Sequence, residues 1–332
     1  MAIIEYINDA LRFKDTVFFK ENSDLQDRYE ALTKLNSEYP KNDNIQNEMY
    51  CIKKGLDGEK EIEYQLKKAN VGMYVLHDVK LKYKDLTAQI DYVVITPVFT
   101  YYIECKNLVG NITVNEKGDF IREYNINGKK VKKGMYSPLR QVEAQREVVR
   151  KIWENNVSSL KRIFASKNFN YYRRVLVVAA NQDTVLNTYK APKDIKNKVL
   201  RADALVRQIQ YDYEHRNKYD YVDNKNDIEK EAQSYINLIS DDNIDYYEYY
   251  KEKYCKELFE TDKELLKEKL IQFRKERSAQ MKIPAYYVLT NDELDKIVEL
   301  RPKTLDELKK INILTPIKIK THGEKIIEVI NE

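Results

Sequence analysis

The sequence predicts an α/β fold, of the α+β kind, in which a mixed sheet is flanked by helices and a separate small all-helical domain follows. Two observations lead to this fold class. Between about residues 74 and 180, apolar segments with a period of two are interleaved with segments of helical period. After residue 262 the apolar residues keep the helical period alone, over four successive segments.

The helices and strands expected before residue 181 can be placed one after another from capping, turn and periodicity signals. Ser23 and Asp24 are expected to cap a helix that ends near Pro40, and a second helix is expected from Gly55 onward. Asn127-Gly128 is a hairpin signal. The expected strands are 74–79, 87–96, 101–105 and 174–180, with shorter pieces at 110–113 and 120–124, and the expected helix between them is 137–153.

The chain divides into four expected regions. They are a helical N-terminal extension (1–50), a sheet domain (51–210), an acidic and partly helical connector (211–262), and a helical domain (263–332) with helices at 263–280, 290–299, 304–311 and 323–330. The net charge is +9 over residues 1–210, −8 over 211–262 and +3 over 263–332. The positive first segment is compatible with binding a polyanion such as DNA, although lysine-rich surfaces also serve solubility.

Composition excludes several classes of protein. The 332 residues are 42% hydrophobic and 34% charged, with 58 basic and 54 acidic residues, which is typical of a globular protein and not of a disordered one. No apolar run has the length of a membrane helix and the N-terminus has no leader pattern, so a cytoplasmic location is expected. Three scattered cysteines and three histidines do not support a disulfide framework or a zinc site, so a bound metal would have oxygen ligands.

The central chemical feature is a set of charged residues at two neighbouring strands. If the strands at 87–96 and 101–105 pair as a hairpin, Asp91 meets Glu104 and Lys106 on one face. Two converging carboxylates suit Mg²⁺ or Mn²⁺, and the lysine would lie beside the metal-bound water. The alternative is an ion pair at a sheet edge. A chance Glu-x-Lys occurs elsewhere, at Glu307 and Lys309, where a solvated helix is expected.

Four ordered motifs, covering about residues 52–215, make the sequence resemble the nuclease-related domain (NERD) of the restriction-endonuclease-like group. The matching segments are Gly55 to Glu59, Gln89 to Asp91, Tyr102 to Lys106, and Ser137 to Gln141 with Gln145. The resemblance implies a mixed sheet with flanking helices. One departure is Tyr92, which replaces the family's usual histidine at a position expected to face away from Asp91.

The resemblance also implies roles for the site residues. Asp91 and Glu104 would ligate Mg²⁺ or Mn²⁺, Lys106 would assist the nucleophile, and Glu59 would complete the acidic, metal-binding set. Gln141 and Gln89 would orient groups or contact the nucleic-acid backbone. Without the resemblance, Glu59 has an ordinary explanation as an acidic residue at a helix N-terminus, and Gln141 as a surface residue.

A basic run lies between the last strand piece and the following helix. The residues expected, with Gln89 and Gln145, to contact nucleic acid are Lys129, Lys130, Lys132, Lys133 and Arg140, and the run continues along the helix with Arg146, Arg150 and Lys151. They are placed to receive a phosphate backbone beside a site whose own carboxylates would repel it. A solvated surface is the alternative interpretation.

Residues 263–332 resemble the HRDC domain, a small helical module that serves as an auxiliary nucleic-acid or protein-binding unit. The resemblance lies in Ile283 to Val288, in Arg301-Pro302, and in the spacing of the later leucines up to Gly323. Asn312 to Pro316 departs from the family's glycine-containing turn, which presents backbone N–H groups to phosphates. DNA binding by this domain is therefore open, with a protein partner as the alternative.

The function expected from these features is metal-dependent hydrolysis of phosphodiester bonds in nucleic acid, with DNA as the expected substrate and no membrane partner. A homodimer is compatible with the resemblance, since restriction-like sites often work in pairs. Two other functions stay open: a DNA-binding scaffold that keeps the fold without activity, and an adaptor that acts through residues 211–332.

Overall fold

The computed structural model describes residues 13–126, 128–156, 168–240 and 244–331. They form two compact units, Met1–Tyr247 and Glu248–Glu332, which are described separately. None of the helices in the described ranges combines the length and the apolar content needed to span a membrane.

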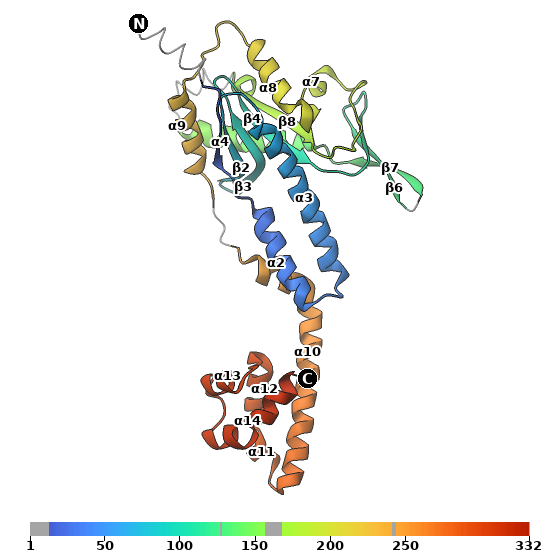
Figure 1. The fold of residues 1–332 in the computed structure, drawn as a ribbon, viewed down its shortest axis with the longest axis vertical. Helices are drawn as coiled ribbons and strands as arrows, with labels where there is room; N and C mark the ends of the chain where they lie inside the picture. The colour runs from blue at the N-terminus through green and yellow to red at the C-terminus, as the bar shows by residue number, and fades with distance from the viewer. Residues whose placement is uncertain (1–12, 127, 157–167, 241–243, 332) are drawn as a thin grey trace. The chain divides into compact units, whose positions relative to one another are not determined.

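The first unit is built on a mixed six-stranded sheet (Figure 1). Its strands, in spatial order, are β1 (Thr16–Lys20), β2 (Met73–Tyr83), β3 (Leu86–Ile95), β4 (Thr100–Lys106), β8 (Arg173–Ala179) and β10 (Val199–Arg201). The three central strands β2, β3 and β4 are antiparallel, and the strands outside them pair in parallel. The expected mixed sheet is therefore present.

A second sheet of four strands extends from the same unit. Its order is β7 (Lys129–Met135), β6 (Phe120–Ile126), β5 (Asn111–Val114) and β9 (Leu186–Asn187). The hairpin expected at Asn127-Gly128 joins β6 to β7. Gly128 has φ +77°, which favours glycine, while Asn127 lies outside the described residues.

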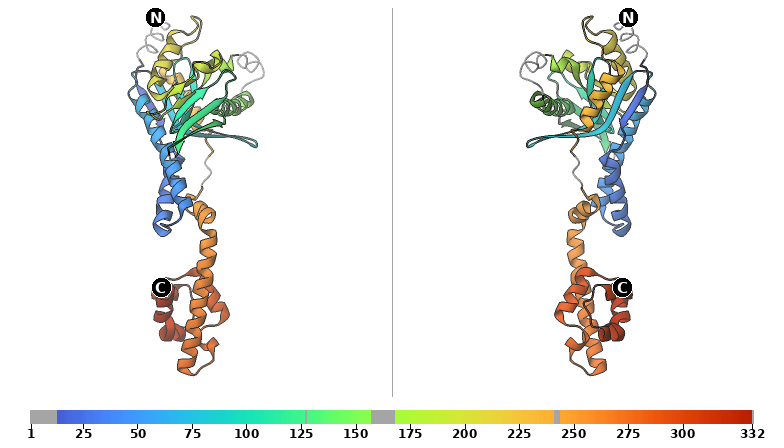
Figure 2. Two further views of the ribbon diagram at one scale, coloured as in Figure 1. Left: turned by 90° about the vertical axis from the view of Figure 1, so that its right-hand side faces the viewer. Right: turned by 90° about the vertical axis from the view of Figure 1, so that its left-hand side faces the viewer.

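Helices cover both faces of the six-stranded sheet (Figures 1 and 2). One face packs against α3 (Asp43–Lys67) and α8 (Leu205–Glu214), and the other packs against α4 (Pro138–Asn156) and α9 (Lys225–Ile236). Both layers of the core are apolar, which explains why β4 and β8 read as nearly continuous hydrophobic segments. The short elements of the unit are α6 (Phe169–Tyr172), α7 (Lys193–Lys196) and a 3-10 helix (Ala202–Ala204).

The N-terminal extension is not only helical. Residues Thr16–Lys20 form β1, which pairs in parallel with β2 and extends the sheet, before α2 (Asp24–Glu38) begins behind its Ser23 cap. The second helix also begins earlier than expected. Asn42 caps α3 with its side-chain oxygen, so Gly55 and Gly58 lie inside the helix and do not mark its start.

The acidic connector is part of the first unit over much of its length. Its helix α9 lies against β2, and the Tyr102 and Tyr235 hydroxyls are 2.6 Å apart. The Tyr74 hydroxyl donates to Glu229, and Thr100 donates to Glu231 at 2.7 Å. The expected connector is thus partly helical, and several of its carboxylates accept hydrogen bonds from the sheet.

The second unit is helical, as expected. Its helices are the Glu248–Met281 part of α10 (Tyr246–Met281), α11 (Ala285–Val288), α12 (Asn291–Leu300), α13 (Leu305–Lys310) and α14 (Pro316–Asn331). Leu270, Ile297, Leu308 and Ile326 lie in its apolar core. In the turn that lacks glycine, Asn312 has φ +51°, a left-handed conformation that asparagine tolerates.

Candidate active site

Asp91 and Glu104 lie side by side where the pairing of β3 with β4 ends. The last paired residues are Tyr92 and Ile103, so the register brings Asp91 opposite Glu104. Beyond this pair, the Asp91 side chain replaces a backbone carbonyl as acceptor: its Oδ2 accepts a hydrogen bond of 2.6 Å from the Cys105 backbone N–H. The strand pairing inferred from the sequence thus produces the expected meeting of the two carboxylates.

Glu104 is buried and only partly satisfied. Its side chain is 2% exposed, Oε1 is hydrogen-bonded to the Lys106 ammonium, and Oε2 is buried with no hydrogen-bond partner. Lys106 also approaches Gln141 Oε1 at 3.4 Å. Burial raises the pKa of Glu104, although the charge and the hydrogen bond of Lys106 counteract this effect. An unpaired buried carboxylate oxygen is costly, so its presence marks a site that a ligand would complete.

The pKa of Asp91 is raised well above its ordinary value. Burial is the main cause and the negative charge of Glu104 is the second, while the Cys105 N–H favours the ionised form. A divalent cation between Asp91 and Glu104 would remove this repulsion. No group of three or more histidine, cysteine, aspartate or glutamate side chains in the described ranges is arranged to hold a metal ion. Carboxylate oxygens are ligands that Mg²⁺ accepts, and the two side chains would supply two of them if the ion bound here.

Glu59 approaches the site from α3, well inside the helix and not at its N-terminus as expected. Its position depends on Gly58, where a Cβ atom would lie 2.6 Å from Asn107 Cβ and 3.1 Å from Cys105 Sγ. Glu59 Oε2 already has two partners, the Ser23 hydroxyl at 3.1 Å and His77 Nε2 at 2.9 Å. The helix-dipole explanation is therefore wrong, and this oxygen serves to hold neighbouring elements.

His77 is a site residue that the sequence analysis does not single out. It stacks on Tyr92 with ring centroids 4.5 Å apart, and its Nδ1 lies 3.0 Å from the Glu21 carbonyl. Burial lowers the pKa of His77, but the hydrogen bond and charge of Glu59 outweigh burial and leave the pKa raised. The signal available in the sequence was a histidine inside an apolar strand. In the sheet, one strand, β3, separates this histidine on β2 from the Glu-x-Lys motif on β4.

Gln89 and Gln145 brace the strands next to the site. The exposed Gln89 donates to Asp78 Oδ1 at 2.8 Å, and Asp78 has φ +51° in the middle of β2. Gln145 differs from its expected role at the nucleic-acid surface: it is buried, and its amide donates to the Gln89 carbonyl at 2.5 Å. Gln145 therefore ties α4 to β3.

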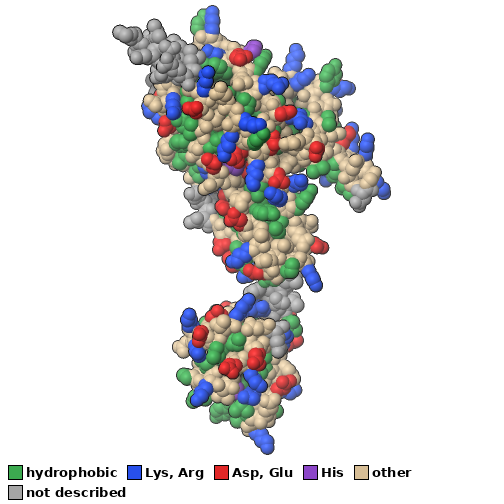
Figure 3. Space-filling model, viewed as in Figure 1, with side chains coloured by type: hydrophobic (Ala, Val, Ile, Leu, Met, Phe, Trp, Pro, Cys, Tyr) green, Lys and Arg blue, Asp and Glu red, His purple; other side chains and the backbone are tan. Residues whose placement is uncertain are grey.

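The basic run occupies a strand, not a connection between a strand and a helix. The four lysines expected to bind nucleic acid are Lys129, Lys130, Lys132 and Lys133, all exposed on β7. Lysine and arginine side chains gather on the projecting β6–β7 hairpin (Figure 3). Arg140 is exposed in the first turn of α4, next to Gln141.

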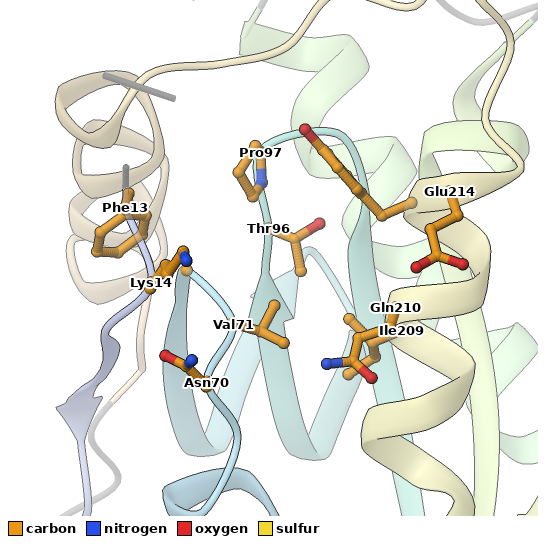
Figure 4. Close-up of a pocket in the computed structure, with 11 residues that line it drawn as sticks. Phe13, Lys14, Asn70, Val71, Thr96, Pro97, Ile209, Gln210 and Glu214 are labelled. Atoms are coloured by element: carbon orange, nitrogen blue, oxygen red, sulfur yellow. The ribbon is translucent and has the colours of Figure 1, made fainter. Parts of the chain in front are cut away.

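A cavity of about 210 Å³ lies away from these residues. Val71 and Gly72 before β2, Thr96 and Pro97 after β3, and Gln210 on α8 are among its lining residues (Figure 4). Because β3 and β4 are antiparallel, the end of β3 lies at the opposite end of the sheet from the carboxylates at the end of β4. The cavity and the candidate active site are therefore separate.

Comparison with protein families matches residues 54–179 to the nuclease-related domain, NERD, and residues 263–330 to the HRDC domain. No curated protein and no solved structure matches the chain. The first match includes Glu59, Asp91, Glu104, Lys106 and Gln141, and the second covers the helical unit except for its first residues and its last two. The chain is therefore a nuclease-like, nucleic-acid-binding protein that contains a NERD domain and an HRDC domain.

Proposed function

We propose that the protein hydrolyses phosphodiester bonds in DNA with the help of Mg²⁺ or Mn²⁺ bound at Asp91 and Glu104. The observation that carries the proposal is the buried Glu104 Oε2 atom, which has no hydrogen-bond partner and belongs to a carboxylate beside Asp91 and Lys106. Two adjacent carboxylates whose pKa values are both raised by burial are better explained as a cation site than as a structural ion pair.

The side chains around the two carboxylates have distinct tasks in this proposal. When bound, the metal neutralises phosphate charge and makes a bound water more acidic. Lys106 orients that water and stabilises the negative charge that develops on the phosphate. Gln141 Oε1, 3.4 Å from the Lys106 ammonium, fixes the lysine, and the Cys105 N–H fixes the Asp91 carboxylate.

Glu59 acts in this scheme as a positioning residue through its Oε2 atom. Its Oε2 accepts from Ser23 and contacts His77, so it joins the start of α2 and strand β2 to helix α3. The Tyr92 hydroxyl donates to the Glu59 carbonyl at 2.9 Å and adds a second attachment of β3 to the same turn of the helix. The site thus has a rigid support on the helix side.

The test is cleavage of linear, circular and single-stranded DNA by the full chain in Mg²⁺, Mn²⁺ or EDTA. Asp91→Asn and Lys106→Ala are each expected to reduce cleavage at least about 10³-fold while DNA binding persists. Lys309→Ala is the matched control, since Lys309 belongs to the other Glu-x-Lys sequence and forms an exposed ion pair with Asp306. Binding without cleavage by the wild type in every metal would refute hydrolysis and leave a DNA-binding scaffold.

A further inference from the structure

The β6–β7 hairpin projects from the body of the first unit without support on either face. Phe120 at its base is buried and Met135 packs against the core, whereas every described residue beyond them is half-buried or exposed. β5 pairs with β6 as far as Glu123, so the two-stranded part of the ribbon consists of residues 124–126 of β6 and residues 129–131 of β7, and it is about 10 Å long. A two-stranded ribbon with no third layer contributes little to folding, so its exposed length requires another explanation.

The charge of the ribbon is strongly positive. Between Phe120 and Met135 the chain has five basic residues and one acidic residue, a net charge of +4 that equals the net charge of the whole protein. The acidic residue, Glu123, is paired with Lys132 at 3.0 Å. Arg122 lies over the Tyr124 ring at 4.6 Å and donates to the Val109 carbonyl. Among the described residues, Lys129, Lys130 and Lys133 have no acidic partner.

These lysines lie on both faces of the ribbon. Residues directly opposite in an antiparallel pair share a face, and successive residues alternate between faces. Lys133 is opposite Arg122 and Lys129 is opposite Ile126, so both lysines share one face with Tyr124. Lys130, opposite Asn125, lies on the other face with Lys132. A single phosphate backbone would meet one of these faces, but two backbones with the ribbon between them would meet both.

We infer that the β6–β7 ribbon enters the major groove of B-form duplex DNA, with its two lysine-bearing faces toward the two backbones; this inference rests on the proposed function. A two-stranded ribbon with its side chains is roughly 10 Å thick, and the major groove is about 12 Å wide and 8.5 Å deep. The two-stranded part of the ribbon is longer than that depth. The major groove of an RNA duplex is too narrow for such an insertion, so the substrate class is duplex DNA.

The ribbon is connected to the candidate active site through a short stretch of chain. β7 ends at Met135 and α4 begins at Pro138, and α4 presents the exposed Arg140 and then Gln141, which contacts Lys106. A duplex held by the ribbon would therefore have its position fixed relative to α4. The acidic site gains a source of attraction for phosphate that its own carboxylates do not supply.

The test measures binding by fluorescence anisotropy in EDTA, where cleavage cannot occur, with equal lengths of duplex DNA, single-stranded DNA and duplex RNA. The test variant combines Lys129→Gln, Lys130→Gln and Lys133→Gln. The control combines Lys41→Gln, Lys193→Gln and Lys218→Gln, three exposed lysines elsewhere in the unit that give the same change in net charge. Unchanged thermal unfolding verifies that both variants fold.

We expect the wild type to bind duplex DNA more tightly than it binds single-stranded DNA or duplex RNA. The ribbon variant should bind duplex DNA at least about tenfold more weakly at low salt, with a slope of log K against log salt reduced by about 3, while the control changes little. Bulky groups in the major groove should weaken wild-type binding, and a minor-groove ligand should not compete.

Equal duplex affinity of the two variants, or competition by the minor-groove ligand alone, would overturn the inference; in the first case the lysines only protect the edge strand from pairing. The binding result is independent of hydrolysis. Groove binding without cleavage in any metal would refute the proposed hydrolysis and leave the role of the ribbon intact. Cleavage together with full duplex binding by the ribbon variant would refute the role of the ribbon and leave the proposed hydrolysis intact.

Discussion

The two units of the chain bury different kinds of side chain. Among the described residues, three carboxylates are buried, Glu59, Asp78 and Glu104, and all belong to the first unit. In the described part of the helical unit, the one buried polar side chain is His322, beside an apolar core. Burying charge is costly, and a fold whose only task is to be stable avoids it. The contrast supports the proposal that the reaction takes place in the first unit.

Removing His77 should produce the largest effect on the stability of the first unit. His77→Ala takes away one of the two partners of the buried Glu59 Oε2 and leaves a void beside Tyr92, so we expect a loss of roughly 2–4 kcal/mol in the free energy of unfolding. Chemical denaturation measures it. His215→Ala, at an exposed histidine that stacks on Tyr211, should cost less than about 1 kcal/mol. Similar losses for the two variants would contradict the supporting role of His77.

Two helical glycines, Gly58 in the first unit and Gly323 in the second, provide a second comparison. The Cβ of Gly58→Ala would lie 2.6 Å from Asn107 Cβ, which is close to the backbone, so we expect a loss of about 1–3 kcal/mol. In Gly323→Ala the nearest atom, at 2.7 Å, is Leu305 Cδ1 at the end of a flexible side chain. Helix propensity should then balance the contact and leave stability within about 1 kcal/mol. Thermal unfolding measures both changes in stability. A larger loss of stability in Gly323→Ala than in Gly58→Ala would contradict this expectation.

Neutralising Asp91 should stabilise the protein when no metal is present. The pKa of Asp91 is raised in the folded chain, so its ionisation opposes folding and wild-type stability should fall as the pH rises from about 4 through that pKa. Asp91→Asn should gain on the order of 1 kcal/mol at neutral pH in EDTA. It should also lose the rise in melting temperature that Mg²⁺ or Mn²⁺ gives the wild type. A metal-induced rise that survives in Asp91→Asn would place the cation elsewhere.

The smallest effect is expected at His322 in the helical unit. Burial lowers the pKa of His322, and the nearby Arg277 and Lys318 lower it further. A lowered pKa means that protonation favours the unfolded chain, so this unit should lose stability as the pH falls below about 6.5. His322→Leu should remove that part of the pH dependence. Melting curves at pH 5 and 7 measure it, and equal acid sensitivity in both proteins would show that His322 does not contribute.

The strands and the meeting of Asp91 with Glu104 could be predicted because they depend on local periodicity and on one hairpin. The alternation of side chains along β3 and β4 determines which residues share a face, and a short connection brings the two strands together. The same holds for α4, whose apolar face has a clear helical period and which places Gln141 beside Lys106.

The missing parts of the prediction depend on contacts between segments far apart in the chain. Glu59 looked like the start of a helix because two glycines precede it, but Gly58 is required by the close approach of α3 to Cys105 and Asn107. The partnership of His77 with Glu59 joins a strand to a helix, and no local pattern encodes it. The lysines of β7 read as a loop because an exposed ribbon lacks the apolar alternation that marks a half-buried strand.

The hydrogen bond from Ser23 to Glu59 has a practical consequence for dissecting this protein. Ser23 and strand β1 lie more than thirty residues before the first residue of the matched NERD segment, yet they complete the sheet edge and one wall of the site. A fragment cut at residue 54 would expose the edge of β2 and deprive Glu59 of a donor. The smallest piece of the chain that can be tested for activity therefore begins at or before β1, and the extent of the family match underestimates the unit that folds.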